Sequence, residues 1–384
     1  MKRTSDTTKQ TDKFGSGKHG YTEGTPGVTA PTRVRAADLD MLQEELANAV
    51  EDERALDSAS YRQLADVLAG HRERAGLEVW KDHTGGTYTD VAFGAWGTDG
   101  LGLCGASGAL AYVKYENGTL QTASAAGGYT GTFHCMTWSD GVSLGGGASG
   151  FIIGGASGEL QLWTPGSAAT HVALADAYAD DVQGIADNGV DTVVIVGEAG
   201  MIQTIRGLVP EGPTTRATAG SLTGDDIFDV IWCSGLGLFV AAGDNGSGGP
   251  GIQTSPTGIT WTARTASGTG VIRRLAYREG VGIIAVGDNG GGTTLVLKST
   301  DGITWSTVST PTLSTVSDVI ALEQHFVVGS HNGRGFVLIP YRDLTLAYII
   351  PQFATAVASR MTSCGTRVAG INGTADLSFS GRIA

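Results

Sequence analysis

The sequence predicts an all-β protein, a seven-bladed β-propeller of four-stranded blades that is preceded by an extended arm and a short α-helical segment. Three observations predict it. Glycine makes up 60 of the 384 residues while 41% of the residues are apolar, which indicates a folded, turn-rich chain rather than a disordered one. An apolar run that ends in Gly-x-x-Gly recurs seven times, with one extra residue in the sixth copy (Gly329–Gly333), and the first 75 residues lack this repeat.

The repeat is clearest in residues 228–262 and 272–306, where Trp261 and Trp305 lie 44 residues apart. Repeats of about 40 to 50 residues are typical of propeller blades and of solenoids. Because the chain shows no capping segments, we favour a closed ring over residues 76–384. The first glycines of the seven kernels, where we expect the blade hairpins, are Gly105, Gly155, Gly197, Gly243, Gly287, Gly329 and Gly370.

One repeat predicts the strands of a whole blade. We expect strands at Asp229–Trp232, Leu238–Ala242 and Gly251–Ser255, and a fourth strand that carries Thr260 and Trp261. The Gly-Asp-Asn-Gly segment is typical of a tight hairpin, because Asp and Asn tolerate positive φ. The runs FVAAG, IIAVG and VVIVG are continuously apolar, as expected for sheets that are packed on both faces.

The N-terminal part divides into two segments. Residues 1–34 are rich in Gly, Thr, Lys and Pro with almost no large apolar residue, so we expect an extended arm. Residues 35–75 predict a helical segment, because apolar side chains recur at spacings of 3 and 4. After Gly373 only one good strand remains, so we expect Leu77–Trp80 to supply the fourth strand of the seventh blade.

Charge and cysteine usage exclude several function classes. A net charge of −13 argues against nucleic acid as a partner, since such binding requires Lys and Arg to neutralise phosphates. No run of about 18 apolar residues occurs, so we expect no membrane insertion. The widely spaced cysteines Cys104, Cys135, Cys233 and Cys364 favour buried free thiols over a metal site or a disulfide.

Two segments resemble a known structural repeat. Ser255–Trp261 (SPTGITW) and Ser299–Trp305 (STDGITW) resemble the Asp-box, or BNR-like repeat, of sialidase-type β-propellers, although both are one residue shorter between the Asp position and Trp and the first lacks the Asp. The resemblance implies a structural turn between the third and fourth strands. It therefore implies a fold and no activity.

A second resemblance lies near the N-terminus. Residues 11–15 (TDKFG), 20–24 (GYTEG) and 32–50 (TRVRAADLDMLQEELANAV) resemble the N-terminal segment of tailed-bacteriophage tail fibre and tail spike proteins. In that family the segment attaches the protein to the virion, and receptor-binding modules follow it. The residues that the resemblance implicates in attachment are Phe14, Tyr21, Leu39, Leu42 and Leu46.

These observations predict a structural protein of the phage tail, such as a fibre, tip or adaptor, in the virion and assembled in the host cytoplasm. We expect a homo-oligomer that binds other virion proteins through residues 1–75 and a host-surface glycan or protein through the propeller. A ring-forming tail nozzle or conduit and a capsid-decorating protein are alternatives. A sialidase-like hydrolase is disfavoured, because no arginine occurs between Arg74 and Arg206. We expect no enzyme activity, catalytic residue, cofactor or metal.

The turns between second and third strands should share one face with the connections between blades. Loops on a rigid scaffold often carry function, so this rim is the candidate ligand face. Calcium or glycan contacts by the Asp and Asn residues there are an alternative to ordinary hairpin-turn chemistry, which we favour. The candidate residues on the rim are Glu198, Asn245, Asn289, His331 and Asn332.

Overall fold

The structure is a computed structural model of the full chain, which divides into two compact units, Met1–Ala75 and Gly76–Ala384. All described residues belong to the second unit. They are residues 88–94, 100–114, 120–141, 149–172, 180–206, 209–210, 225–288, 294–310, 316–322, 324–330, 336–341, 343–345, 348–350, 358–364, 367–372 and 377–382. The predicted arm, helical segment and Leu77–Trp80 strand lie outside them, as do Phe14, Tyr21, Leu39, Leu42 and Leu46.

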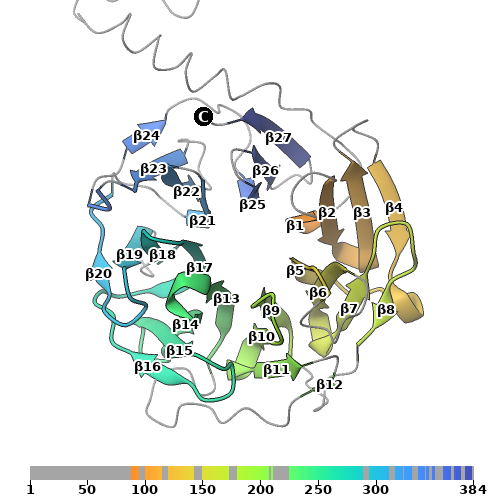
Figure 1. Cartoon of the computed structure of the whole chain (residues 1–384), viewed down its shortest axis with the longest axis horizontal. Coiled ribbons are helices and arrows are strands. Elements are labelled where there is room, and N and C mark those ends of the chain that lie inside the picture. The colour runs from red at the N-terminus through yellow and green to blue at the C-terminus, as the bar shows by residue number, and fades with distance from the viewer. Residues whose placement is uncertain are drawn as a thin grey trace, which may run out of the picture. The chain divides into compact units, whose positions relative to one another are not determined.

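Seven antiparallel sheets follow one another along the chain and are arranged in a ring (Figure 1). Blade 1 contains β1 (Tyr88–Gly94), β2 (Gly100–Gly105), β3 (Ala109–Lys114) and β4 (Leu120–Ser124). Blade 2 contains β5 (Phe133–Ser139), β6 (Gly150–Gly155), β7 (Leu160–Trp163) and β8 (Thr170–His171). Blade 3 contains β9 (Val182–Asp187), β10 (Val193–Gly197), β11 (Ile202–Arg206) and β12 (Val209–Pro210).

The remaining blades repeat the same order. Blade 4 contains β13 (Ile227–Cys233), β14 (Leu238–Asp244), β15 (Pro250–Ser255) and β16 (Thr262–Arg264). Blade 5 contains β17 (Val271–Arg278), β18 (Gly282–Asp288), β19 (Thr294–Ser299) and β20 (Ser306–Thr307). Blade 6 contains β21 (Val316–Ala321), β22 (His325–Ser330), β23 (Phe336–Pro340) and β24 (Tyr348–Ile350). Blade 7 contains β25 (Ala358–Cys364), β26 (Arg367–Asn372) and β27 (Leu377–Arg382).

The predicted all-β propeller is therefore confirmed, with the first strand of each blade innermost (Figure 1). Two local predictions were wrong. The fourth strand of blade 4 follows Trp261 and does not include it, because the indole is buried and donates from Nε1 to the Gly258 carbonyl (2.8 Å). The hairpin after β14 spans residues 245–249, so its positive φ angles fall on Gly246 and Gly248 rather than on Asp or Asn.

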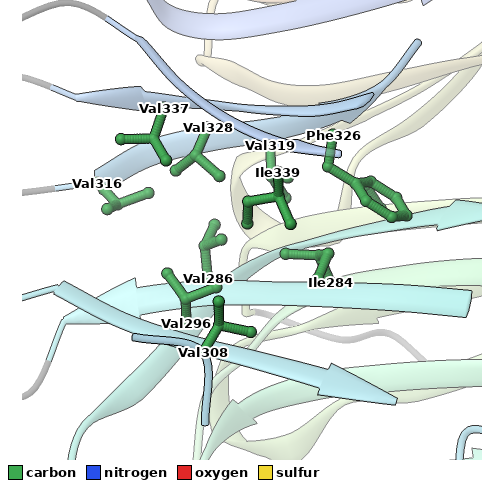
Figure 2. Close-up of a cluster of buried hydrophobic side chains, with 11 residues drawn as sticks. Ile284, Val286, Val296, Val308, Val316, Val319, Phe326, Val328, Val337 and Ile339 are labelled. Atoms are coloured by element: carbon green, nitrogen blue, oxygen red, sulfur yellow. The ribbon is translucent and has the colours of Figure 1, made fainter. Parts of the chain in front are cut away.

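The hydrophobic core is divided among the interfaces between neighbouring blades. At the interface of blades 5 and 6, for example, Ile284 and Val286 lie opposite Val328 and Phe326 (Figure 2). Similar clusters of buried residues occur between the other neighbouring blades in the described part of the chain. Because the sheets are covered on both faces, the middle residues of their second strands are apolar; every residue of β10 is buried.

The kernel glycine is required by close backbone approach. A Cβ atom on Gly197 or Gly243 would lie closer than 3.0 Å to the main-chain carbonyl of Asp181 or Asp226, in the connection between two blades. A larger residue would therefore push the connection away from the end of the second strand. No helix in the described ranges is long and apolar enough to cross a membrane.

Candidate functional site

One face of the ring, here called the upper face, carries the turns after the second strands together with the connections between blades. Main-chain bonds join the two: the Glu198 amide donates to the Asp181 carbonyl (3.1 Å) and the Asp244 amide to the Asp226 carbonyl (3.1 Å). Glu198 and Asn245 both lie on this face. The other candidate rim residues, Asn289, His331 and Asn332, fall outside the described residues.

The two described rim residues have local partners. Asn245 Oδ1 accepts from the amides of Ser247 (2.9 Å) and Gly249 (2.8 Å), so its side chain forms its own hairpin. Glu198 Oε1 accepts from Gln183 Nε2 of β9 (3.5 Å). Hairpin-turn chemistry thus accounts for Asn245, whereas Glu198 connects a turn to the innermost strand.

Carboxylates from the blade connections hold the tight turns of blades 2 and 3. Asp181 Oδ1 accepts from the Ser157 amide (2.9 Å) and Asp226 Oδ1 from the Ala199 amide (3.1 Å). Ser157 and Ala199 have left-handed φ angles of 59° and 51°, which cost free energy for residues other than glycine. These acceptors stabilise backbone that would otherwise be strained.

The sequence did not predict the β-bulges at the start of the innermost strands. In each blade one residue is skipped in the register between the first and second strands at the upper face. Bulges redirect side chains and are frequent beside functional sites. The seven bulged residues are Thr89, His134, Gln183, Phe228, Arg273, Ser317 and Ser359.

Four of these residues, on blades 2 to 5, form what we call the mouth cluster: His134, Gln183, Phe228 and Arg273. His134 Nε2 lies 3.1 Å from Asp181 Oδ2. The Arg273 guanidinium stacks over the Phe228 ring, 4.4 Å from its centroid, and its Nε lies 3.3 Å from Asp288 Oδ2. The Arg273 side chain remains 43% exposed, so the cluster presents aromatic and cationic groups to solvent.

The residues that follow the bulges, here called the axial set, contact the next blade. They are Asp90, Cys135, Gly184, Asp229, Arg274, Asp318 and Arg360. Each carboxylate accepts from a main-chain amide of the following blade: Asp90 from Met136 (2.7 Å), Asp229 from Leu275 (2.8 Å) and Asp318 from Met361 (2.6 Å). The axial set therefore fastens neighbouring innermost strands together.

The axial arginines complete an alternating series of charges from blade 4 through blade 7 to blade 1. Arg274 Nη1 donates to the Phe228 carbonyl (2.8 Å), and its Nε lies 4.0 Å from Asp318 Oδ1. Arg360 Nε lies 3.9 Å from Asp90 Oδ1, across the junction of the last and first blades. Acidic and basic groups thus face each other where the ring closes.

Burial changes the acidity of these groups. Desolvation raises the pKa of Asp90 and of Asp229 to about 6 and the pKa of Asp318 to about 7, while the positive charge of Arg274 opposes each increase. Desolvation also raises the pKa of the thiols of Cys104, Cys135 and Cys233. These three cysteines are buried and free, as predicted.

The sequence marks the axial set by its position in the repeat. The residue directly before the apolar core position of each first strand varies between Asp, Arg, Cys and Gly, as in TDV, RRL, HCM and QGI. A polar residue at a fixed place in a buried repeat indicates a contact along the ring axis. Within the described residues, no group of three or more His, Cys, Asp or Glu side chains could hold a metal ion.

Comparison with known proteins gives the following similarities. No family model matches the chain. The uncharacterized protein StfP of Escherichia coli strain K12 is 43% identical over 70 residues, which cover 18% of this chain and 34% of StfP. The chain thus spans about a third of the length of this curated relative.

Solved structures are similar over most of the ring. The structure of U3-55K has a TM-score of 0.60 and 13% identity, YCF48 from Cyanidioschyzon merolae 0.59 and 16%, and the WD40 repeats of RRP9 0.58 and 13%. Each match covers 79% of this chain and 97–98% of the other chain. At such identities the similarity concerns the fold, and the described strands, from β1 to β27, form a β-propeller.

Proposed function

We propose that the chain is a non-enzymatic structural protein of a phage tail, a fibre, tip or adaptor, that presents the upper face of its propeller to a host-surface glycan or protein. Residues 1–75 attach it to other virion proteins, and the chain assembles in the host cytoplasm as a homo-oligomer. The attachment part of the proposal rests on the resemblance of residues 11–50 to tail fibre and tail spike proteins.

The mouth cluster is the observation that supports the binding part. His134, Gln183, Phe228 and Arg273 lie on consecutive blades, at the bulges of strands whose backbones are fixed by the ring. Aromatic rings and arginines are enriched at the energetic centres of protein interfaces.

Ligand binding is a better description of this face than catalysis. The carboxylates of Asp181, Asp226 and Asp288 are paired with main-chain amides, with His134 or with Arg273. A general acid or base must instead face a substrate atom at hydrogen-bond distance. The Asp-box-like turns after Ser255 and Ser299 lie between third and fourth strands, far along the sheet from these groups, and serve as structural turns.

Binding is tested with two arginines at opposite ends of the same strand. Arg273 lies near the start of β17 and Arg278 ends it, so Arg273→Ala changes the upper face and Arg278→Ala the lower one. We expect Arg273→Ala to weaken adsorption of the full-length protein to host cells about tenfold or more, in the range of interface hot spots, and Arg278→Ala to leave it unchanged. Equal adsorption of both folded variants and the wild type would contradict the upper-face assignment.

Attachment is tested on the particle itself. Gold-labelled antibody against the propeller should decorate the tails of phage particles that carry the full-length chain. Particles assembled with a chain that starts at residue 76 should not be labelled. The masses of the full-length and shortened proteins in solution distinguish a tail fibre from a tail nozzle. A fibre is expected to be a trimer, and a nozzle is expected to be a sixfold or twelvefold ring. Protein found only outside the particles would refute the virion assignment.

A further inference from the structure

The axial set contains one more acid than base. Asp90, Asp229 and Asp318 are opposed by Arg274 and Arg360; Asp318 is buried, and Asp90 and Asp229 are partly buried. In such surroundings an unbalanced charge costs free energy, because neither water nor salt screens it well. The cluster becomes electroneutral when one carboxylate takes up one proton from water.

Asp318 is the carboxylate best placed to take that proton. Its side chain is 7% exposed, against 15% for Asp90. The cationic partner of Asp318 is Arg274. The Arg274 Nε lies 4.0 Å from Asp318 Oδ1, and the Arg274 Nη1 already donates to the Phe228 carbonyl. Asp90 has a separate partner in Arg360, and Asp229 lies on the far side of Arg274.

We propose that the axial set is a proton-binding site, with the proton on Asp318, and that this proton makes the stability of the closed ring depend on pH between mildly acidic and slightly alkaline conditions. The step is the protonation of one carboxylate, and no other bond changes. The link to ring closure follows from the contacts of Asp318, which joins blade 6 to blade 7 through the Met361 amide.

In the described part of the chain, the charged and titratable groups around the axial carboxylates lie on innermost strands or next to them. Arg274 of β17, Arg360 of β25, Asp90 of β1 and Asp229 of β13 belong to the axial set. The thiols of Cys104 on β2 and Cys135 on β5 have raised pKa values, so they remain neutral across this pH range. The proton balance is therefore set by three carboxylates and two guanidinium groups.

The sign of the effect follows from the raised pKa of Asp318, about 7 in the fold against 3.8 as its ordinary value. The folded chain holds a proton that the unfolded chain releases, so the contribution to stability is full below pH 3.8 and is lost as pH rises through about 7. Because unfolding releases one proton in this pH range, the unfolding equilibrium constant increases up to about tenfold for each unit by which the pH rises.

The experiment compares the full-length wild type with Asp318→Asn, which keeps an acceptor oxygen but cannot titrate. Urea unfolding from pH 5 to pH 8 should give an equilibrium constant that increases less steeply with pH in Asp318→Asn than in the wild type. Asp301→Asn is the matched control, because Asp301 is exposed, has a lowered pKa and should leave the slope unchanged. Equal slopes in Asp318→Asn and the wild type would overturn the proposal.

Infrared spectroscopy keeps the proposal falsifiable if Asp318→Asn does not fold. The wild type at pH 6 should show the carbonyl band of a protonated carboxylic acid, and this band should disappear by pH 8. Arg274→Gln removes the charge that holds the carboxylate pKa values down, so the band should persist to higher pH in this variant. A wild-type spectrum with no such band at pH 6 would refute the proton-binding site.

Discussion

Single residues of the axial set show how a neighbouring blade decides what each position can hold. A Cβ atom on Gly184 would lie 3.0 Å from Asp229 Cα, so a larger residue in blade 3 would require its neighbours to shift by a few tenths of an ångström. At the same position blade 4 carries Asp229, which reaches the Leu275 amide of blade 5. The residue type therefore follows the spacing and the hydrogen-bond needs of the next innermost strand.

Two substitutions of Asp229 should separate the contribution of its hydrogen bond to stability from the contribution of its charge. Asp229→Ala leaves the Leu275 amide without its partner and should lower the free energy of unfolding by about 1 to 3 kcal/mol, the cost of an unsatisfied buried group. Asp229→Asn retains an acceptor oxygen and should lose clearly less. Urea unfolding at one pH measures both, and equal losses would show that the charge and not the hydrogen bond matters.

The elements differ in how their turns are built. In blades 2 and 3 a three-residue turn with a left-handed Ser157 or Ala199 is held by a carboxylate of the next connection. The longer turn of blade 4 is held by its own Asp244 and Asn245. The short turns therefore depend on a carboxylate of a neighbouring segment. The long turn is held by its own side chains and by the Gly270 amide of the next connection, which donates to the Gly248 carbonyl (2.9 Å).

For the blade 3 turn, two adjacent acids provide a test. Asp226→Ala should remove the acceptor of the Ala199 amide, accelerate hydrogen exchange at that amide and cost about 1 kcal/mol, as for the loss of a capping side chain. Asp225→Ala changes the net charge equally and should leave the exchange at Ala199 as it is. Equal acceleration in both variants would attribute the effect to surface charge.

A substitution of Trp305 tests how tightly blade 5 packs against blade 4. Its side chain is 6% exposed, packs in the core between blades 4 and 5, and donates from Nε1 to the Gly302 carbonyl (3.2 Å). Trp305→Ala should therefore cost about 3 to 5 kcal/mol through the cavity that it leaves. Ile303, in the same turn, is 48% exposed, so Ile303→Ala should change the melting temperature little.

The described blades form a ring, so the first and last blades must meet. Arg360 and Asp90 face each other at this junction, and Asp90 continues the contact to the Met136 amide of blade 2. Because the junction joins segments about 270 residues apart in the chain, its contacts form at a large cost in loop-closure entropy. We expect the junction to be the first part of the ring to open.

Arg360→Met tests this expectation, since it keeps a long apolar side chain but leaves Asp90 without its nearest cation. The amides of β1 and β25 should exchange with solvent faster than those of β13 and β17, and the global stability should fall by about 1 to 3 kcal/mol. Uniform exchange in all four strands would show that the junction is no weaker than the other interfaces.

The sequence by itself determined the number of blades, the apolar second strands and the buried tryptophans, because these features recur at a constant spacing and depend on local hydrophobicity. Only the tertiary structure revealed the bulges, the mouth cluster and the axial set. Their residues are unlike one another and lie in successive repeats, so only their shared position in the first strand of each blade relates them in the sequence. They come together because the ring places the same position of every blade at one axis, where backbone spacing, burial and opposite charge decide which side chain fits.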